Sequence, residues 1–250
     1  MKDVRTIRLY VEQKLRSGSF VELPDKLSHY LCNVMRCREG NVISCFNPAD
    51  GEFDCRITAI GKKKTIIEVG IRKRFSEENN DVWLLFAPLK KDKTDFVIEK
   101  AVELGVTKII PVLTSRTNAD KVKTERFAAQ AVEAAEQCGR LSVPEIAEPI
   151  ELNNLLRSWE NDRQLFFMDE RRSGADILTA FGNSAGKPAA LLVGPEGGFS
   201  DDETAVLNRH PCVKDISLGP RILRAETAAT AALAVWQAVA GDWRHDGEKQ

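Results

Sequence analysis

Short apolar segments separated by turn signals make up most of the first 75 residues. Five segments rich in Ile, Val, Phe and Thr have this character: residues 5–11, 18–23, 41–47, 52–60 and 64–71. Between the second and third segments, a stretch opened by Pro24 and Asp25 carries apolar residues at helical spacing. The strands and their turns predict a small β-barrel that one helix interrupts.

Residues 75–81 are acidic and amide-rich, and this composition predicts a linker. Beyond it, apolar runs typical of buried strands alternate with helical patterns. The strands are predicted at 82–87, 109–113, 164–168, 189–193 and 213–218, and the helices at 96–104, 127–138, 152–159, 175–181, 201–209 and 225–240. Ser200 and Glu203 have the spacing of a capping box before the fifth helix. Such alternation predicts an α/β domain with a mostly parallel sheet covered on both faces.

The composition is that of an ordinary globular protein, with 43 % hydrophobic and 29 % charged residues among 250. No apolar run approaches the length of a membrane span, and the first ten residues mix charged with apolar residues, unlike a signal peptide. Six cysteines occur singly, without a CxxC pair, and three histidines accompany them. We therefore expect a cytoplasmic protein with reduced thiols, no membrane partner and no metal site.

The charges are divided unevenly between the two parts of the chain. Residues 1–75 hold 15 Lys and Arg against 9 Asp and Glu, whereas residues 76–250 hold 21 against 28. A basic surface can serve solubility alone, but it is also where the phosphate backbone of a nucleic acid binds. The N-terminal third is therefore the candidate for nucleic-acid binding.

The first candidate for chemistry is the loop LLVGPEGGFS at residues 191–200, which follows a predicted buried strand. In an open α/β sheet, ligands bind at the carboxyl ends of the strands. Glycines at 194, 197 and 198 allow the backbone to approach a ligand closely, and the following helix offers free amide groups. A glycine-rich turn without a ligand is the alternative. The loop is not a Walker loop, and the chain holds no GxGxxG fingerprint.

The second candidate is the segment ISLGPRILRAETA at residues 216–228, in which Arg221, Arg224 and Glu226 crowd the start of a helix. The N-terminal end of a helix dipole disfavours cations, so two arginines there indicate an anion that binds them. Alternatively, both arginines are solvated or paired with Glu226 or Asp215.

Together, the motifs GPEGG and LGPRILRAETA resemble the two signature motifs of the SPOUT-class methyltransferases. The resemblance is specifically to the ribosomal RNA small subunit methyltransferase E family, which makes 3-methyluridine in 16S rRNA. Further segments are similar: Arg8 in IRLY, residues 29–36 (HYLCNVMR) with Gly40, residues 100–106 (KAVELGV), Arg116 and residues 133–140 (EAAEQCGR). One departure is KDKTD at residues 91–95, where the family usually has Gly-Asp-Arg, so that Lys93 stands in place of an arginine.

The resemblance implies a PUA-like RNA-binding β-barrel at residues 1–74, a linker at 75–81 and a SPOUT methyltransferase domain at 82–250. It also implies a trefoil knot in the mostly parallel sheet, which chains otherwise avoid. S-adenosylmethionine is the implied methyl donor, and the implied assembly is a homodimer. The Ala-rich last helix offers a close-packing stripe for a dimer, or packs only on its own sheet. The stripe consists of Ala228, Ala231, Ala232, Val235, Trp236 and Val239.

Within this resemblance, the expected site residues fall into three groups. The cofactor is expected at the two loops, on Leu192, Gly194, Glu196, Gly197, Gly198, Ile216, Leu218, Gly219, Ile222 and Leu223. Arg224 is expected to stabilise the uracil oxyanion that forms when N3 loses its proton, with Glu226 or a water as the proton acceptor. The 16S rRNA of the small ribosomal subunit is expected on Arg8, His29, Arg36 and Arg38.

Two alternatives remain. Another SPOUT enzyme would methylate a ribose hydroxyl or a guanine ring nitrogen, but the similarity over the full length, including the N-terminal barrel, opposes it. A ribosome-assembly factor would bind RNA without catalysis, and the intact pair of cofactor loops opposes that.

Overall fold

In a computed structural model of the chain, residues 7–75, 81–117, 122–159, 162–171 and 174–244 are described. The chain divides into two compact units. The N-terminal unit consists of Met1–Glu78 and Ala135–Val143, and the C-terminal unit consists of Asn79–Ala134 and Pro144–Gln250. The domain bounds that the resemblance implies stay a prediction, and residues 76–80 of the expected linker lie outside the described residues.

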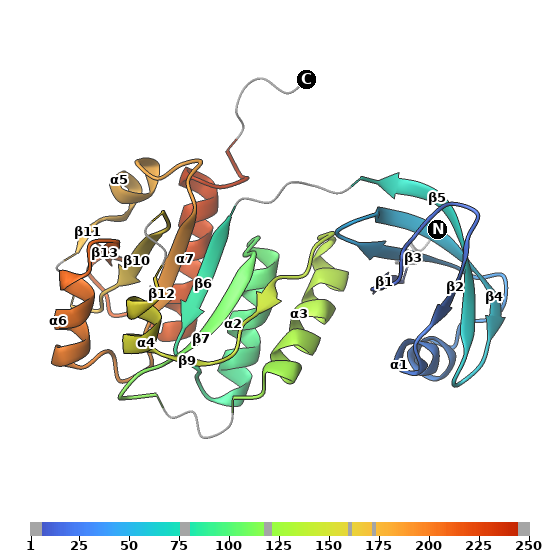
Figure 1. The fold of residues 1–250 in the computed structure, drawn as a ribbon, viewed down its shortest axis with the longest axis horizontal. Helices are drawn as coiled ribbons and strands as arrows, with labels where there is room; N and C mark the ends of the chain where they lie inside the picture. The colour runs from blue at the N-terminus through green and yellow to red at the C-terminus, as the bar shows by residue number, and fades with distance from the viewer. Residues whose placement is uncertain (1–6, 76–80, 118–121, 160–161, 172–173, 245–250) are drawn as a thin grey trace. The chain divides into compact units, whose positions relative to one another are not determined.

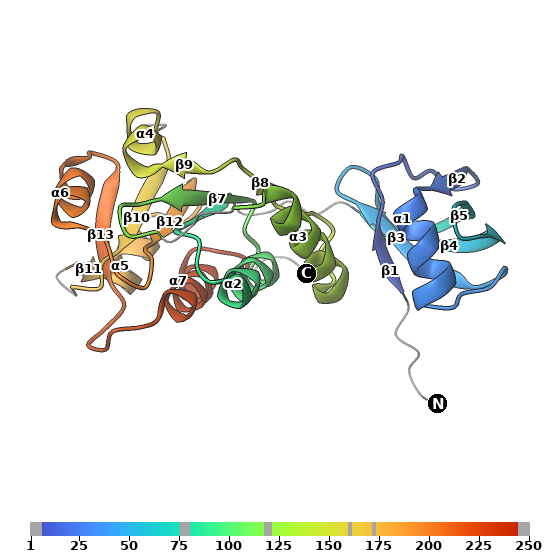
Figure 2. The same ribbon diagram turned by 90° about the horizontal axis from the view of Figure 1, so that it is seen from below.

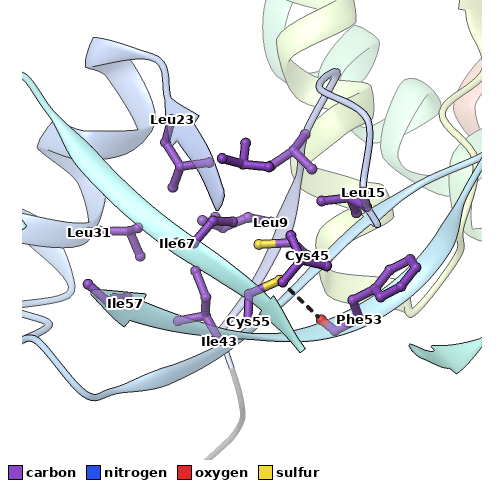
Figure 3. Close-up of a cluster of buried hydrophobic side chains, with 13 residues drawn as sticks. Leu9, Leu15, Leu23, Leu31, Ile43, Cys45, Phe53, Cys55, Ile57 and Ile67 are labelled. Atoms are coloured by element: carbon purple, nitrogen blue, oxygen red, sulfur yellow. Dashed lines mark hydrogen bonds between the residues drawn. The ribbon is translucent and has the colours of Figure 1, made fainter. Parts of the chain in front are cut away.

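The N-terminal unit contains a five-stranded sheet in the order β1-β3-β4-β5-β2. Its strands are β1 (Arg8–Tyr10), β2 (Phe20–Leu23), β3 (Val42–Asn47), β4 (Gly51–Ile60) and β5 (Thr65–Arg74). β1 and β3 are parallel and the other pairs are antiparallel. The sheet curls around a core that includes Leu9, Leu31, Ile43, Cys55 and Ile67 (Figure 3). The predicted strands are confirmed, and over the described residues they form a half-barrel.

The predicted helix of this unit changes its hydrogen bonding halfway along. It begins as α1 (Asp25–His29) and continues as the π-helical turn η1 (Tyr30–Val34), where the Met35 amide donates to the Tyr30 carbonyl at 3.0 Å. Arg36 follows in the left-handed region, at φ 53°. Left-handed backbone is unusual for a residue other than glycine, and π-helical turns often lie at functional sites. Helical spacing alone does not distinguish this wider turn from an α-helix.

The C-terminal unit contains a parallel sheet in the order β11-β13-β10-β12-β6-β7-β8, with β9 paired to β7. Its main strands are β6 (Val82–Phe86), β7 (Lys108–Leu113), β10 (Gln164–Met168), β12 (Ala189–Val193) and β13 (Val213–Ser217). Short strands are β8 (Glu145–Ile146), β9 (Ile150–Glu151) and β11 (Ala175–Asp176). The predicted parallel sheet is confirmed, while the trefoil knot stays a prediction.

Helices cover both faces of this sheet (Figures 1 and 2). On one face lie α2 (Lys91–Glu103), α5 (Ile177–Gly182) and α7 (Ala225–Val239), and on the other lie α4 (Leu152–Arg157) and α6 (Asp201–Arg209). Trp236 of α7 packs against Phe166 and Phe181, whereas neighbouring Phe167 belongs to the cluster under α4 and α6. Burial on both sides explains why β10 and β12 are continuous apolar runs. The strand predicted at 213–218 is less buried than expected, because in β13 (VKDIS) only Ile216 is fully enclosed.

One local signal predicted from the sequence is confirmed in the helices. Ser200 and Glu203 form the predicted capping box at the start of α6. Gly105 and Gly139 adopt positive φ just after α2 and α3 (Thr124–Cys138), where a left-handed residue ends a helix. Along the described parts of the chain, no helix combines the length and apolar character that a bilayer crossing requires.

Candidate active site

A pocket of about 210 Å³ lies where the two predicted loops meet at the carboxyl ends of β10 and β12. Parallel strands bring these ends to one edge of the sheet, so segments far apart in sequence converge there. The pocket is lined by Met168, Glu170, Val193, Gly194, Pro195, Glu196, Gly198, Ile222, Leu223, Arg224, Ala225 and Ala228. An adjoining cavity of about 40 Å³ shares part of this lining and adds Asp169, Leu218, Gly219 and Arg221.

Most of the expected cofactor residues contribute to these cavities, but three do not. Leu192 and Ile216 are fully buried within β12 and β13. Gly197 also lies outside the lining, and a Cβ atom added there would be 3.5 Å from Cδ of Arg116. Glu226, although close in sequence to Arg224, also lies outside the lining residues of both cavities. The contacts expected of these four residues stay predictions.

The loop at residues 194–200 after β12, which we call the glycine loop, packs closely against its neighbours. Gly198 has a φ of 68°, and a Cβ atom there would lie 2.1 Å from Oε1 of Glu170. A Cβ atom at Gly194 would lie 2.5 Å from the ring of Phe199. The loop is also held from outside, because Arg116 donates to the Gly197 carbonyl at 2.7 Å. These contacts explain the glycines and give Arg116 a positioning role for the loop.

Sequence reasoning missed the contribution of the segment that follows β10. Asp169 and Glu170 come directly after this buried strand and line the cavities. The sequence did contain a sign of this role, because two carboxylates directly follow an apolar run, just as the glycines directly follow the apolar run of β12. Glu170 and Glu196 add negative charge to the pocket, which favours a ligand that carries positive charge.

A cluster of charged side chains from three segments lies beside the pocket. Nζ of Lys93, in α2, is 3.0 Å from Oε1 of Glu196 and 3.6 Å from Oε1 of Glu226. The hydrogen bond to Glu196 raises the pKa of Lys93, and the same bond lowers the pKa of Glu196. Arg224 is the N-cap residue of α7 and is exposed. Glu226 thus pairs with Lys93, and among the described residues neither Arg221 nor Arg224 forms an ion pair.

Known proteins are similar to this chain over most of its length. Residues 76–237 match the family model of the RNA methyltransferase domain, and residues 23–70 match that of the RNA methyltransferase PUA domain. The ribosomal RNA small subunit methyltransferase E of Rickettsia conorii is 34 % identical over 91 % of this chain and 93 % of its own. The chain belongs to the ribosomal RNA small subunit methyltransferase E family.

Other members of the methyltransferase E family show similarity of comparable extent. The Bacillus subtilis protein is 30 % identical, over 90 % of this chain and 94 % of its own. A crystal structure of the Neisseria gonorrhoeae methyltransferase E, bound to S-adenosyl methionine, has a TM-score of 0.83 and 28 % identity. That match covers 96 % of this chain and all of the other. The resemblance predicted from the two motifs is confirmed.

In this methyltransferase E chain, the expected RNA-binding residues occupy two different environments. His29, Arg36 and Arg38 are exposed on α1 and on the turn after η1. Val34 and Met35 beside them are 59 % and 40 % exposed, which places apolar surface next to the cations. Exposed cations with apolar neighbours suit an RNA, whose phosphates and unpaired bases need both.

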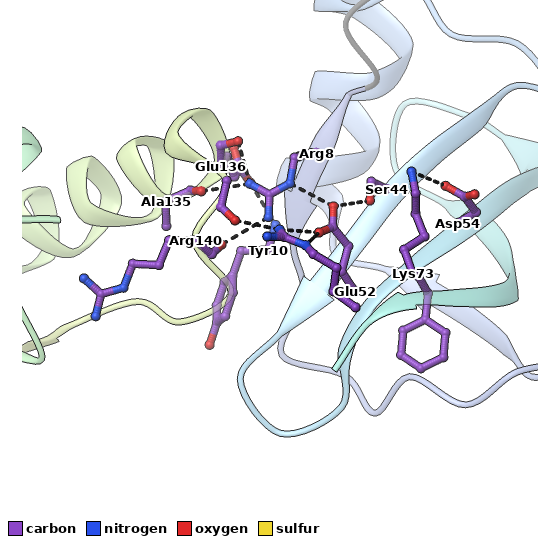
Figure 4. Close-up of polar contacts among 12 residues, drawn as sticks. Arg8, Tyr10, Ser44, Glu52, Asp54, Lys73, Ala135, Glu136 and Arg140 are labelled. Atoms are coloured by element: carbon purple, nitrogen blue, oxygen red, sulfur yellow. Dashed lines mark hydrogen bonds and ion pairs between the residues drawn. The ribbon is translucent and has the colours of Figure 1, made fainter. Parts of the chain in front are cut away.

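Arg8 instead lies within a hydrogen-bonded cluster of the N-terminal unit (Figure 4). Its guanidinium donates to Glu52 Oε1 at 2.9 Å, to the Ala135 and Glu136 carbonyls at 2.9 Å and to the Arg140 carbonyl at 3.1 Å. The Ala135 and Glu136 carbonyls belong to the last turn of α3, and Arg140 follows the helix. Helix C-termini favour cations. The contact of Arg8 with RNA stays a prediction, but the structure gives this residue a structural role.

Glu52 is the centre of this cluster and is only 5 % exposed. It accepts hydrogen bonds from Arg8, Ser44 and Arg74, and Arg74 also donates to the Gly139 carbonyl at 2.6 Å. Burial of the carboxyl raises its pKa, but the hydrogen bonds from these three side chains outweigh burial and lower the pKa from 4.5 to about 2. We call Arg8, Glu52 and Arg74 the helix clamp.

Proposed function

We propose that this protein transfers a methyl group from S-adenosylmethionine to N3 of a uridine in the 16S rRNA of the small ribosomal subunit, in the cytoplasm. The observation that carries the proposal is the pocket at the carboxyl ends of β10 and β12 in a chain of this family. Both motif loops line it, and ligands of open α/β sheets bind at this edge.

The residues of the pocket fit the proposed donor. Gly194 and Gly198 leave the backbone of the loop close to the cavity, and Glu170 and Glu196 favour a cation. When bound, S-adenosylmethionine supplies a methyl group on a positively charged sulfonium, whose carbon–sulfur bond breaks as the nitrogen–carbon bond forms. The exposed guanidinium groups of Arg221 and Arg224 suit anionic groups of the bound molecules.

The methyl acceptor must first lose the proton on its N3 atom. The pKa of a uracil imide lies roughly two to three units above neutrality, so ionisation costs about 3 to 4 kcal/mol at pH 7. In our proposal, Arg224 stabilises the negative charge that develops on the uracil oxygens, and Glu226 accepts the proton. This division assigns charge stabilisation to the N-cap of α7 and proton transfer to its first turn.

Nucleoside mass spectrometry tests the proposal directly. The protein is incubated with isotope-labelled S-adenosylmethionine and either naked 16S rRNA or assembled small subunits, and the nucleosides are analysed. We expect labelled 3-methyluridine. Labelled 2′-O-methyl nucleosides or 1-methylguanosine would establish a different SPOUT activity, and RNA binding without transfer would indicate a non-catalytic assembly factor.

The RNA surface is proposed on the exposed cations of the N-terminal unit. Replacing Arg36 and Arg38 together by Ala should weaken RNA binding about tenfold and reduce the slope of log affinity against log salt by about 2, since about two phosphate contacts are lost. The control is the double replacement of Lys62 and Lys63 by Ala, which removes equal charge from another exposed turn. Equal losses in both double variants would contradict a localised RNA surface.

We also propose a homodimer, on the strength of the family resemblance. The α7 stripe gives it limited support, because Ala228, Ala232 and Trp236 are buried within their own unit and only Ala231, Val235 and Val239 remain partly exposed. Sedimentation equilibrium at micromolar concentration should give twice the chain mass of 27.8 kDa. A species of one chain mass would refute the dimer.

A further inference from the structure

Lys93 joins three segments that lie far apart in the sequence. It belongs to the first turn of α2, which begins at Lys91, and its ammonium group lies between Glu196 of the glycine loop and Glu226 of α7. Lys93 and Glu196 are separated by 103 positions along the chain. The Lys93 ammonium group therefore links the glycine loop to the first turn of α7, which carries the proposed proton acceptor Glu226.

The position of Lys93 is unfavourable for a cation on local grounds. The first turn of a helix carries partial positive charge, which favours Asp or Glu and disfavours Lys. The Lys93 side chain is 28 % exposed, and ion pairs that solvent reaches contribute little to stability. Neither helix formation nor folding energy explains a lysine at this position, so its explanation lies in the two carboxylates that it contacts.

Glu226 is held so that its two oxygens have different surroundings. Oε1 faces the ammonium group of Lys93, while Oε2 is buried and has no hydrogen-bond partner among the described residues. A buried acceptor without a donor destabilises a protein. Such an oxygen is suited to receive a hydrogen bond from a bound molecule, and the neighbouring residues Arg224 and Ala225 line the pocket.

We propose that Lys93 is a positioning residue for methyl transfer: it orients the Glu226 carboxylate through Oε1, so that Oε2 faces the N3–H group of the methyl acceptor. This inference rests on the proposed function. The N3 proton passes to Oε2 of Glu226, and the electron pair left on N3 forms the bond to the methyl carbon. The bond between that carbon and the donor sulfur breaks at the same time, and its electron pair stays on the sulfur, which becomes a neutral thioether. Lys93 itself keeps its proton and touches neither donor nor acceptor.

The test combines single-turnover methyl transfer to small-subunit 16S rRNA with calorimetric titration of S-adenosylmethionine. Lys93→Met should slow transfer by about 10²-fold, because a misplaced catalytic group loses its near-attack geometry, while the dissociation constant of the cofactor changes less than about threefold. Lys93→Arg keeps a cation between the carboxylates and should restore the rate to within about tenfold of the wild type. The matched control is Lys91→Met, in the same helical turn but exposed, which should behave as wild type.

A double variant shows whether Lys93 acts through Glu226. Glu226→Gln should slow transfer by about 10²-fold or more, the usual effect of losing a general base. Adding Lys93→Met to Glu226→Gln should slow transfer by no more than about threefold further, because residues that act as a unit are not additive. Thermal denaturation of each variant without ligand, with a midpoint close to that of the wild type, separates these effects from unfolding.

Three results would overturn the inference while leaving the proposed function in place. They are an unchanged rate in Lys93→Met, a loss of cofactor affinity in proportion to the rate, and multiplicative effects in the double variant. A proportional loss of cofactor affinity would mean that Lys93 serves to hold the glycine loop in place for cofactor binding. Multiplicative effects would mean that Lys93 acts independently of Glu226. No methyl transfer by the wild-type protein would instead overturn the proposed function and the inference together.

Discussion

Replacing Arg224 with Ala should slow methyl transfer by about 10²-fold or more while cofactor affinity changes only a few-fold. Arg224 lines the pocket as the N-cap residue of α7, and its guanidinium is exposed. The helix dipole disfavours a cation there unless negative charge develops nearby. Loss of one preorganised group that stabilises an oxyanion reduces rates by about 10²- to 10³-fold.

Single-turnover transfer at several pH values measures this effect. The rate should rise with pH in the range where the uracil imide ionises, and more steeply in Arg224→Ala, because the variant has lost help with deprotonation. Arg209→Ala is the control, since Arg209 is an exposed arginine at the end of α6. If Arg224→Ala keeps near-normal turnover, or loses affinity in proportion to rate, the chemical role passes to Arg221, Glu226 or a residue of the second subunit in the proposed homodimer.

Replacing Glu52 with Gln should lower the free energy of unfolding of the N-terminal unit by about 3 kcal/mol at pH 7. The substitution leaves the guanidinium of Arg8, whose side chain is only 15 % exposed, without its counter-charge. Breaking a buried ion pair destabilises a protein by about 3 to 5 kcal/mol. The lowered pKa of Glu52, about 2 against 4.5, corresponds to a similar energy.

The pH dependence of the Glu52 effect has a definite sign. The folded carboxyl has the lower pKa, so its stabilisation is fully present above pH 4.5 and is lost as the pH falls toward 2. The difference between wild type and Glu52→Gln should therefore shrink across this range.

Denaturant titrations can follow each unit separately, because both tyrosines lie in the N-terminal unit and all four tryptophans in the C-terminal unit. The control is Glu22→Gln, because Glu22 pairs with Lys64 in solvent and its loss should change stability by less than about 1 kcal/mol. Equal effects of both substitutions would show that the helix clamp does not stabilise the unit.

The sequence predicted the strands and helices that bury enough apolar surface to leave a periodic signal. The runs at 82–87 and 189–193 became β6 and β12, side by side in the sheet. The two-residue strands β8, β9 and β11 left no such signal, because so few residues cannot establish a period. The π-helical turn η1 was missed because its apolar spacing is compatible with an ordinary helix.

The candidate site was predicted as far as its residues cluster along the chain. Glycines and arginines marked the two loops, and both loops line the pocket. Glu170 was missed although it follows a buried strand, as the glycines do. The pairing of Lys93 with Glu196 and the hydrogen bonds of Arg8 were also missed, because they depend on tertiary contacts between distant segments, for which a single sequence carries no local pattern.

The helix clamp also affects how the N-terminal unit can fold during translation. Residues 8–74 encode every strand of the N-terminal sheet, yet the carbonyls that receive Arg8 and Arg74 belong to residues 135–140. During translation this sheet emerges from the ribosome well before its last hydrogen-bonding partners exist. A fragment ending at residue 75 would be left in the same incomplete state, so an excised N-terminal unit should be joined to residues 135–143 by a short linker.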